Sequence, residues 1–196
     1  SVKLIQRCPA RPGIVSLPSM VLPYPTNGHD VPLYLAPMAG VSERPYRLLC
    51  RRHGADVVVS EFLSAEGLRR GSERTMEMAA FEAEERPIGI QIFGSDPAAM
   101  AEAAALVTEH FQPDFVDVNF GCPVRKVTKT GAGATLLDDP DRAARIVSSI
   151  ADTVDIPVTV KLRRGLRDRS RDCLVVGPLL VEAGGASPPP HPPPAQ

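Results

Sequence analysis

The feature that most constrains the fold of this chain is a regular alternation of short apolar runs with helix-like segments. The apolar runs lie at residues 32–37, 56–62, 87–94, 114–121 and 156–162. Their nearly continuous apolar character is typical of strands that are covered on both faces. Strands that alternate with helices predict an α/β fold with a parallel sheet and right-handed crossovers.

Helix signals fill the segments between these strands. We expect helices over residues 44–53, 98–111, 140–153 and 172–183. Their end signals are Gly54 after the first, Asp96 and Pro97 before the second, Asp138 or Asp139 before the third, and Gly184 and Gly185 after the fourth. Pro178 is expected to kink or end the last helix. The charged stretch 64–86 is expected to be a loop with helical turns.

Such a sheet can belong to either of two architectures, a doubly wound open sheet or a TIM (β/α)8 barrel. The first strand is not followed by GxGxxG, and GxxxxGK[ST] does not occur, so the nucleotide-binding open-sheet folds are disfavoured. Five strands cannot close an eight-stranded barrel. If the fold is a barrel, the chain therefore holds only the N-terminal five βα units of an incomplete one.

The prolines mark where this alternation stops. Of the 21 prolines, six lie in residues 1–32 and six in residues 188–194. We therefore expect an irregular Pro-rich leader over residues 1–31, a partial barrel over residues 32–185, and a disordered Pro-rich tail over residues 186–196.

Other features of the composition exclude several classes of protein. The sequence has no apolar run of about 18 residues and no compact signal segment, which argues against a membrane-spanning or secreted chain. Cys8, Cys50, Cys122 and Cys173 lack the spacing of a zinc site or a disulfide framework. We expect a cytoplasmic chain with reduced thiols and no metal. The net charge of −1 neither indicates nor excludes a polyanionic partner.

Polar or otherwise special residues recur at or just beyond the carboxyl ends of the predicted strands. They are Pro37, Met38, Ala39 and Gly40; Ser60 and Glu61; Gln91; Asn119, Gly121, Cys122 and Pro123; and Lys161 and Arg163. In a parallel α/β fold these strand ends share one rim, and that rim carries the chemistry. One such residue is more often structural, but recurrence over five strands favours a functional site.

Three residues of this rim, and the segment that follows one of them, bear on its chemistry. Cys122 follows a strand directly, and a mostly protonated thiol suits a proton donor as well as a nucleophile, although an unpaired cysteine is more often structural. Lys161 ends an apolar strand and needs an anionic or electron-rich partner to offset its desolvation. Gln91 offers a donor and an acceptor to a heterocycle edge, as a flavin or nucleobase presents. The segment after Cys122 indicates either a mobile basic loop over the site or an ordinary solvated loop, because it holds Gly131, Gly133, Arg125, Lys126 and Lys129.

Segments 35–56, 59–62, 88–97, 114–137 and 157–165 resemble the tRNA-dihydrouridine synthase family, in particular its bacterial type-B-like branch. The most specific motifs are NFGCP, which begins at Asn119, and KVTKTGAGA, which begins at Lys126. The resemblance implies that residues 32–185 form a partial FMN-binding TIM barrel of a monomeric enzyme. It also implies that the enzyme reduces the C5–C6 bond of uridines in tRNA and that NADPH re-reduces the flavin.

Carried over position by position, the resemblance implies roles for single residues. Cys122 is the implied catalytic residue, which protonates C5 of the uracil as hydride reaches C6. The implied flavin-binding residues are Pro37, Met38, Ala39, Gln91 and Lys161. The implied substrate-binding residues are Asn119, which is placed to contact flavin or uracil, and Arg125, Lys126 and Lys129, which suit the tRNA phosphates.

The family pattern fades after about residue 165. The expected His-Gly-Arg segment and late βα units that bind the flavin phosphate do not follow, and residues 187–196 read SPPPHPPPAQ. Residues 161–171 carry six cations against Asp168, which indicates either a nucleic-acid-binding patch or, as we favour, a truncated or out-of-frame C-terminus. We therefore expect impaired FMN binding and activity. The alternatives are another FMN-barrel dehydrogenase of a small pyrimidine-like substrate and an inactive fragment.

Overall fold

The centre of the fold is a parallel sheet in the order β1-β2-β4-β5-β6, with β3 also paired with β4. The computed structural model describes residues 32–167 and 170–186, so the predicted leader and residues 187–196 of the predicted tail lie outside the described residues. The strands are β1 (Tyr34–Leu35), β2 (Val57–Val59), β3 (Leu63–Ser64), β4 (Ile88–Phe93), β5 (Phe115–Phe120) and β6 (Val158–Leu162).

Strands β2 and β3 are two parts of one strand position; β2 lies within the predicted strand 56–62, and β3 lies just beyond it. β2 pairs with the first half of β4, where Val58 lies opposite Ile88, and β3 pairs with the second half, where Leu63 lies opposite Ile92. The offset changes from 30 to 29 residues, because the chain bulges between the two parts. The sheet thus has five strand positions, all parallel. The predicted fold class, an α/β fold with the N-terminal five βα units of an incomplete TIM barrel, is confirmed.

The helices follow the predicted pattern closely. They are α1 (Arg44–Arg52), α2 (Ala65–Arg69), α3 (Glu73–Ala79), α4 (Pro97–Phe111), α5 (Arg125–Thr128), α6 (Pro140–Ala151) and α7 (Cys173–Glu182), with the 3-10 helices η1 (Ala83–Glu85) and η2 (Gly133–Asp138). The four predicted helices begin and end within two residues of their expected bounds. Asp96 caps α4 by accepting from the Ala99 N–H, and Asp139 caps α6 by accepting from the Arg142 N–H.

Two local predictions need correction. Residues 64–86 hold more regular structure than a loop with helical turns, because α2, α3 and η1 fill most of this stretch. The Ser64 hydroxyl starts α2 by accepting from the Gly67 N–H. Pro178 lies inside α7, so of the two predicted effects, a kink or an end of the helix, the end is wrong. The N–H that proline lacks would have paired with the Leu174 carbonyl, and Leu174 is exposed, so water can take that place.

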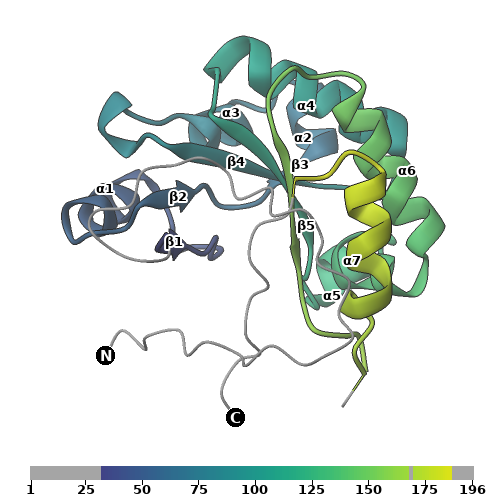
Figure 1. The fold of residues 1–196 in the computed structure, drawn as a ribbon. Coiled ribbons are helices and arrows are strands. Elements are labelled where there is room, and N and C mark those ends of the chain that lie inside the picture. Colours follow the sequence, from purple (N-terminus) through teal and green to yellow (C-terminus); the bar gives the residue numbers. More distant parts are fainter. Residues whose placement is uncertain (1–31, 168–169, 187–196) are drawn as a thin grey trace.

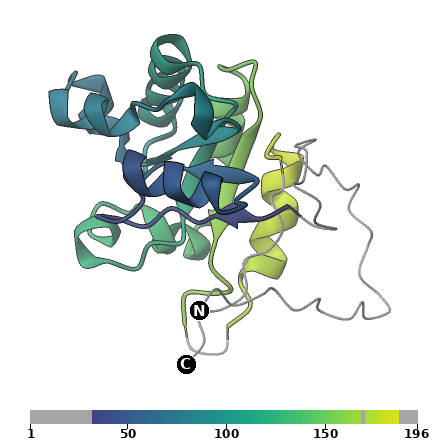
Figure 2. The same cartoon turned by 90° about the vertical axis from the view of Figure 1, so that its left-hand side faces the viewer.

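Helices α2, α4, α6 and α7 lie along one face of the curved sheet (Figure 1). Ile90 and Ile92 of β4 and the even-numbered residues of β5 belong to the larger buried apolar cluster, in which Ile90 and Val118 pack with Met100 of α4 and Ile146 of α6. Helix α1 lies against β2 and α7 against β6, so they flank opposite ends of the strand order; α1 faces the viewer in Figure 2. Within the described ranges, no helix is long and apolar enough to cross a membrane.

The inner face of the sheet carries the odd-numbered residues of β4, β5 and β6. A small apolar cluster there holds Val57, Val59 and Phe115, with Tyr34 packed against it. Gly89 makes this packing possible, because a Cβ at that position would lie 2.1 Å from the Phe115 ring. Further along the same face the residues become polar, and the candidate site begins.

After α7 the chain returns to the sheet. The Ala186 N–H donates to the Val158 carbonyl at 2.6 Å, and Ala186 forms a parallel bridge with Thr159 of β6. The free side of β6 is therefore paired at this point by Ala186, four residues after the end of α7.

Candidate active site

The turn after β1 holds the predicted Pro37–Ala39 segment at the rim. The Met38 N–H donates to the Ser42 hydroxyl at 2.8 Å, and that hydroxyl donates to the Met38 carbonyl at 3.0 Å. The Gly40 N–H donates to Glu61 Oε2 at 2.7 Å, which ties the turn to the segment after β2. Gly40 has a φ of +70°, which favours glycine. Pro37 is half-buried, whereas Met38 and Ala39 are exposed.

A buried ion pair lies beneath this turn. Arg47 Nε of α1 is 2.5 Å from Glu85 Oε2 of η1, and the two side chains are only 2% and 0% exposed. The same guanidinium donates to the carbonyls of Ser42 at 2.9 Å and Ala80 at 3.0 Å. Glu85 also accepts from the Glu82 N–H. Arg47 and Glu85, called the ion-pair cluster below, thus join α1, η1 and the end of the turn after β1.

A second set of buried polar groups supports the turn after β5. Asn119 Oδ1 accepts from the backbone N–H groups of Gly121 at 3.1 Å and Cys122 at 2.9 Å. Asn119 Nδ2 donates to Gln91 Oε1 of β4 at 2.9 Å. The backbone N–H of Gln91 donates to the Ser60 hydroxyl at 3.0 Å. The turn that carries Cys122 is therefore held by the Asn119 side chain, which lies within the sheet.

This set of hydrogen bonds continues to a carboxylate. Gln91 Nε2 donates to Asp117 Oδ2 at 2.5 Å, and the Thr159 hydroxyl of β6 donates to Asp117 Oδ1 at 2.5 Å. Asp117, Gln91 and Asn119 are all buried, and we call them the carboxamide chain. Burial raises the pKa of Asp117 to about 6, while the hydrogen bonds from Thr159 and Gln91 and the charge of Lys161 act in the opposite direction. Burial also raises the pKa of Tyr34.

Cys122 is half-buried at the beginning of the next segment, and that segment packs against it. The Cys122 carbonyl accepts from the Ala134 N–H at 3.0 Å. Gly133 has a φ of +65°, and a Cβ there would lie 2.6 Å from the Cys122 oxygen. The predicted glycine-rich loop is therefore corrected to two short helices, α5 and η2, with residues 132–134 buried. Gly133 serves close packing against the cysteine turn.

The remaining predicted residues lie around this turn. Lys161 is half-buried and is the register partner of Asn119 on the neighbouring strand. Arg125 and Lys126 are on α5, Lys129 follows it, and all three are exposed. The structure thus brings Gln91, Asn119 and Cys122 into one hydrogen-bonded set, with Lys161 paired beside Asn119 in the sheet. It places Pro37–Ala39 in the separate turn after β1.

Sequence reasoning missed Asp117, Thr159 and the ion-pair cluster. Asp117 and Thr159 precede Asn119 and Lys161 by two residues, and the period of a strand places such pairs on the same face. That alternation was a usable signal for both residues. Arg47 and Glu85 are 38 residues apart on different helices, and no local pattern connects them.

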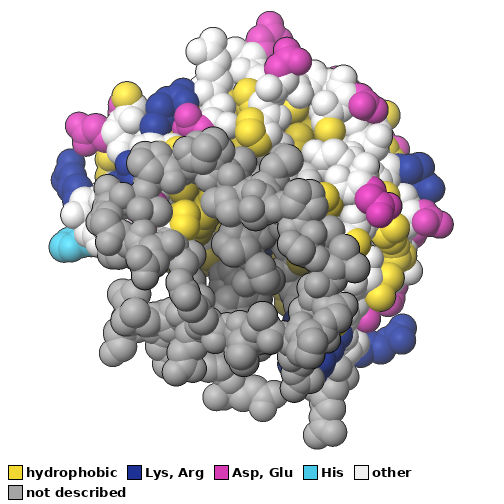
Figure 3. All heavy atoms as spheres, in the orientation of Figure 1, with side chains coloured by type: hydrophobic (Ala, Val, Ile, Leu, Met, Phe, Trp, Pro, Cys, Tyr) yellow, Lys and Arg dark blue, Asp and Glu magenta, His cyan; other side chains and the backbone are white. Residues whose placement is uncertain are grey.

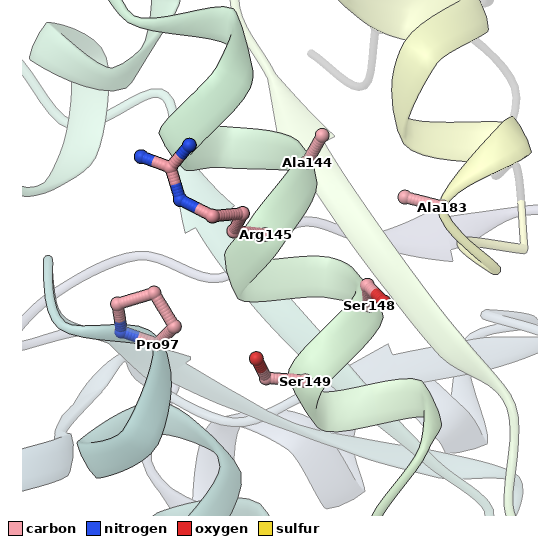
Figure 4. A pocket seen from close by; sticks show the side chains of 6 residues that line it. All are labelled: Pro97, Ala144, Arg145, Ser148, Ser149 and Ala183. Atoms are coloured by element: carbon pink, nitrogen blue, oxygen red, sulfur yellow. The ribbon is translucent and has the colours of Figure 1, made fainter.

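Away from the rim, the described residues form one further hollow that can be compared with the predicted site. A shallow hollow of about 370 Å³ lies over α6, with Pro97 on one side of the helix and Ala183 on the other (Figure 4). Its other lining residues, Ala144, Arg145, Ser148 and Ser149, include none of the predicted site residues. Hydrophobic side chains also show on the side where α6 and α7 lie (Figure 3), and Leu174 and Val175 of α7 are each 65% exposed.

A parallel α/β half-barrel with polar groups gathered at the carboxyl ends of its strands defines part of a TIM-barrel protein. The family profile described as "Dihydrouridine synthase (Dus)" matches residues 34–187, which includes α7. The chain therefore belongs to the dihydrouridine synthase family.

Curated relatives agree with this membership. The chain is 41% identical over 152 residues to the tRNA-dihydrouridine synthase B of Pseudomonas aeruginosa, a match that covers 78% of this chain and 46% of the relative. It is 39% identical over 152 residues to the tRNA-dihydrouridine synthase B of Vibrio vulnificus, with 78% and 47% covered. It is 38% identical over 165 residues to the probable tRNA-dihydrouridine synthase of Treponema pallidum, with 82% and 48% covered. The chain thus spans about half the length of these relatives.

The polar edge of an isoalloxazine ring needs donors and acceptors of hydrogen bonds. Gln91 and Asn119 carry carboxamides and Lys161 adds a cation on the neighbouring strand, so the kinds of group at this rim suit a flavin. Gln91 is 0% exposed, and its carboxamide atoms pair with Asp117 and Asn119. Among residues 32–167 and 170–186, no group of three or more His, Cys, Asp or Glu side chains is arranged to hold a metal ion.

Proposed function

We propose that this chain forms the N-terminal half of an FMN-dependent tRNA-dihydrouridine synthase, which reduces the C5–C6 bond of uridines in tRNA with NADPH as the reductant. The observation that carries the proposal is the placement of Cys122. It follows β5 at the carboxyl rim, its N–H is held by Asn119, and its carbonyl is held by Ala134. Family membership over residues 34–187 supports the same reading.

The chemistry asked of Cys122 is the donation of one proton. When a hydride reaches C6 of uracil, the electron pair that develops at C5 must take up a proton, and the Cys122 thiol supplies it. A thiol is mostly protonated at neutral pH and can act as this acid without a partner. The two backbone contacts fix the position of the turn, so that the Cys122 side chain is presented from a rigid support.

FMN, when bound, supplies the hydride chemistry. The residues that would hold its ring are Pro37–Ala39 in the turn after β1, Gln91 on β4 and Lys161 on β6. The cation of Lys161 favours negative charge in its surroundings, and Asn119 orients the turn on which the uracil would rest. The flavin phosphate requires groups from the half of the relatives that this chain does not span, so we expect the chain alone to bind FMN poorly.

The tRNA partner is supported by the exposed cations after Cys122. Arg125, Lys126 and Lys129 lie within seven residues of the proposed proton donor and are exposed. Cations so near a reacting base suit the phosphates that flank a uridine turned out of its stack.

The test uses a chimera in which residues 34–186 replace the matching segment of the tRNA-dihydrouridine synthase B of Pseudomonas aeruginosa. It is expressed in a bacterium that lacks dihydrouridine synthases, and dihydrouridine in tRNA is measured by mass spectrometry. The chimera is expected to restore dihydrouridine, and the 196-residue chain alone to form little. The proposal is contradicted if a flavin-loaded chimera leaves tRNA unmodified and instead consumes NADPH with a free pyrimidine.

A further inference from the structure

The groups at the two ends of the carboxamide chain determine the orientation of its two amides. At one end, Asn119 Oδ1 accepts from two backbone N–H groups, so the NH2 group of Asn119 must face Gln91. Gln91 therefore presents its oxygen to Asn119 and its nitrogen to residue 117. At the other end stands a carboxylate, which can only accept. Each amide is held in one of two possible orientations by its neighbour.

We propose that Asp117 is a positioning residue, which fixes the orientation of the Gln91 and Asn119 carboxamides and through them the backbone turn that presents Cys122. An amide side chain alone can turn over, because its two ends have similar shape. The carboxylate of Asp117 removes that freedom. If Gln91 turned over, its oxygen would face a carboxylate oxygen of Asp117, and its NH2 group would face the NH2 group of Asn119, which would lose its acceptor. Asn119 would then favour the orientation that releases the Gly121 and Cys122 N–H groups.

The burial of the three side chains makes this effect strong. Gln91 is 0% exposed, Asp117 4% and Asn119 7%, so water cannot replace a lost partner. The groups that face Asp117 are Gln91 of β4, Thr159 and Lys161 of β6, and the Tyr34 phenol of β1. Of these, only Gln91 leads from the carboxylate to the cysteine turn. The proposal rests on the proposed function only for the roles of Cys122 and Gln91, and its test needs neither flavin nor tRNA.

The test reverses the direction of the hydrogen bonds in the carboxamide chain, and it uses the 196-residue protein. Asp117→Asn removes the obligatory acceptor, and Asn119→Asp makes two carboxylates compete for the single NH2 group of Gln91. In the double variant Asp117→Asn/Asn119→Asp, Gln91 can turn over with every group paired: Asp at 119 accepts from Gln91 and from both backbone N–H groups, and Asn at 117 donates to Gln91 and accepts from Thr159. Thr159→Val is the matched control, because it removes one donor to Asp117 and leaves the orientation of Gln91 unchanged.

The first readout is the folding equilibrium from denaturant unfolding. Each single variant is expected to lower the folding constant by about tenfold or more, and the double variant to return to within about threefold of the original. The second readout is the rate at which dithiodipyridine modifies Cys122, resolved by mass spectrometry against Cys8, Cys50 and Cys173. Asp117→Asn is expected to raise the Cys122 rate severalfold, while the double variant and Thr159→Val remain at or below the original rate.

The proposal is overturned if the two single losses add in the double variant, because independent structural roles give additive losses. It is equally overturned if Asp117→Asn leaves the Cys122 rate unchanged. If Asp117→Asn does not fold, the double variant decides alone: a folded double variant supports the proposal, and an unfolded one contradicts it. Loss of flavin binding or of tRNA reduction in the chimera would instead count against the proposed function.

Discussion

The ion-pair cluster and the carboxamide chain both support a turn at the rim, but they do so by different means. Arg47 and Glu85 balance one full charge with another and hold the turn after β1. The carboxamide chain holds the turn after β5 with a single carboxylate, whose effect passes through two neutral amides. The first cluster is neutral as a pair, whereas the second contains a carboxyl group whose pKa is raised by burial.

Because of this difference, a substitution in one cluster affects mainly the stability of the protein, whereas a substitution in the other also affects the position of the Cys122 turn. A buried ion pair is sensitive to the loss of either partner, because the remaining charge is left buried without compensation. The hydrogen bonds of the carboxamide chain depend on the orientation of each amide and on the protonation of the Asp117 carboxyl group at its end. We therefore expect changes in the ion-pair cluster to act mainly on the free energy of unfolding, and changes in the carboxamide chain to act also on Cys122.

The largest expected effect comes from breaking the ion-pair cluster. Arg47→Met leaves the Glu85 carboxylate buried without its partner and should lower the free energy of unfolding by about 3–5 kcal/mol. The double variant Arg47→Met/Glu85→Leu should lose less, because neither charge remains. Denaturant unfolding measures both values. A loss below about 1 kcal/mol for the single variant would mean that the pair is hydrated in solution.

The next effect concerns the packing of η2 against the cysteine turn. Gly133→Ala places a Cβ against the Cys122 carbonyl at a positive φ and should cost about 3 kcal/mol. Gly131→Ala is the matched control: its φ is +75°, but a Cβ there meets no atom closer than 3.5 Å, so about 1 kcal/mol is expected. Equal losses in the two variants, measured by thermal unfolding, would show that contact with Cys122 is not what requires Gly133.

A pH effect distinguishes the carboxamide chain from the ion-pair cluster. The pKa of Asp117 is raised to about 6 in the folded chain, so between about pH 4 and 6 the folded state binds more protons at this site than the unfolded state. Stability from this group is therefore present below about pH 4 and is lost as the pH rises through 6. Relative to Asp117→Asn, the original chain should lose on the order of 2 kcal/mol across this window. A difference that stays constant with pH would contradict the raised pKa.

The smallest effect is expected from an exposed ion pair between the same two helices. Arg52 of α1 lies 3.6 Å from Glu84 of η1, with side chains 71% and 74% exposed. Water and salt screen such a pair, so Arg52→Ala should change the free energy of unfolding by less than about 0.5 kcal/mol. A loss comparable to that of Arg47→Met would show that burial is not what separates the two pairs.

The sequence predicted those parts of the molecule that local patterns determine. Alternation of apolar runs predicted the parallel strands, and Asp96, Asp139 and Gly184 marked helix ends where the structure has them. Polar residues at strand ends predicted that Gln91, Asn119 and Cys122 lie on one rim, and the structure joins them by hydrogen bonds. These successes share one cause, since each depends on neighbours in sequence or on the common end of parallel strands.

The parts that sequence reasoning missed depend on partners far apart in the chain. Glu85 interacts with Arg47 only because η1 packs against α1. The reason for Gly133 is a carbonyl on another segment, and its glycine neighbours suggested a loop instead. Asp117 was hidden for another reason: a carboxylate within an apolar strand looks like an exposed residue until its partners Gln91 and Thr159 are known.

The proposed role of Cys122 is to act, from this rim, as the proton donor for uridine reduction. Its most direct test is the rate of dihydrouridine formation in tRNA by the chimera carrying Cys122→Ala, with Cys50→Ala and Cys173→Ala as matched controls and bound flavin measured by absorbance. The Cys122→Ala chimera is expected to retain flavin and to lose at least about 100-fold in rate, while both controls remain active. A Cys122→Ala chimera that forms dihydrouridine at the unmutated rate would contradict the role of Cys122 as the proton donor.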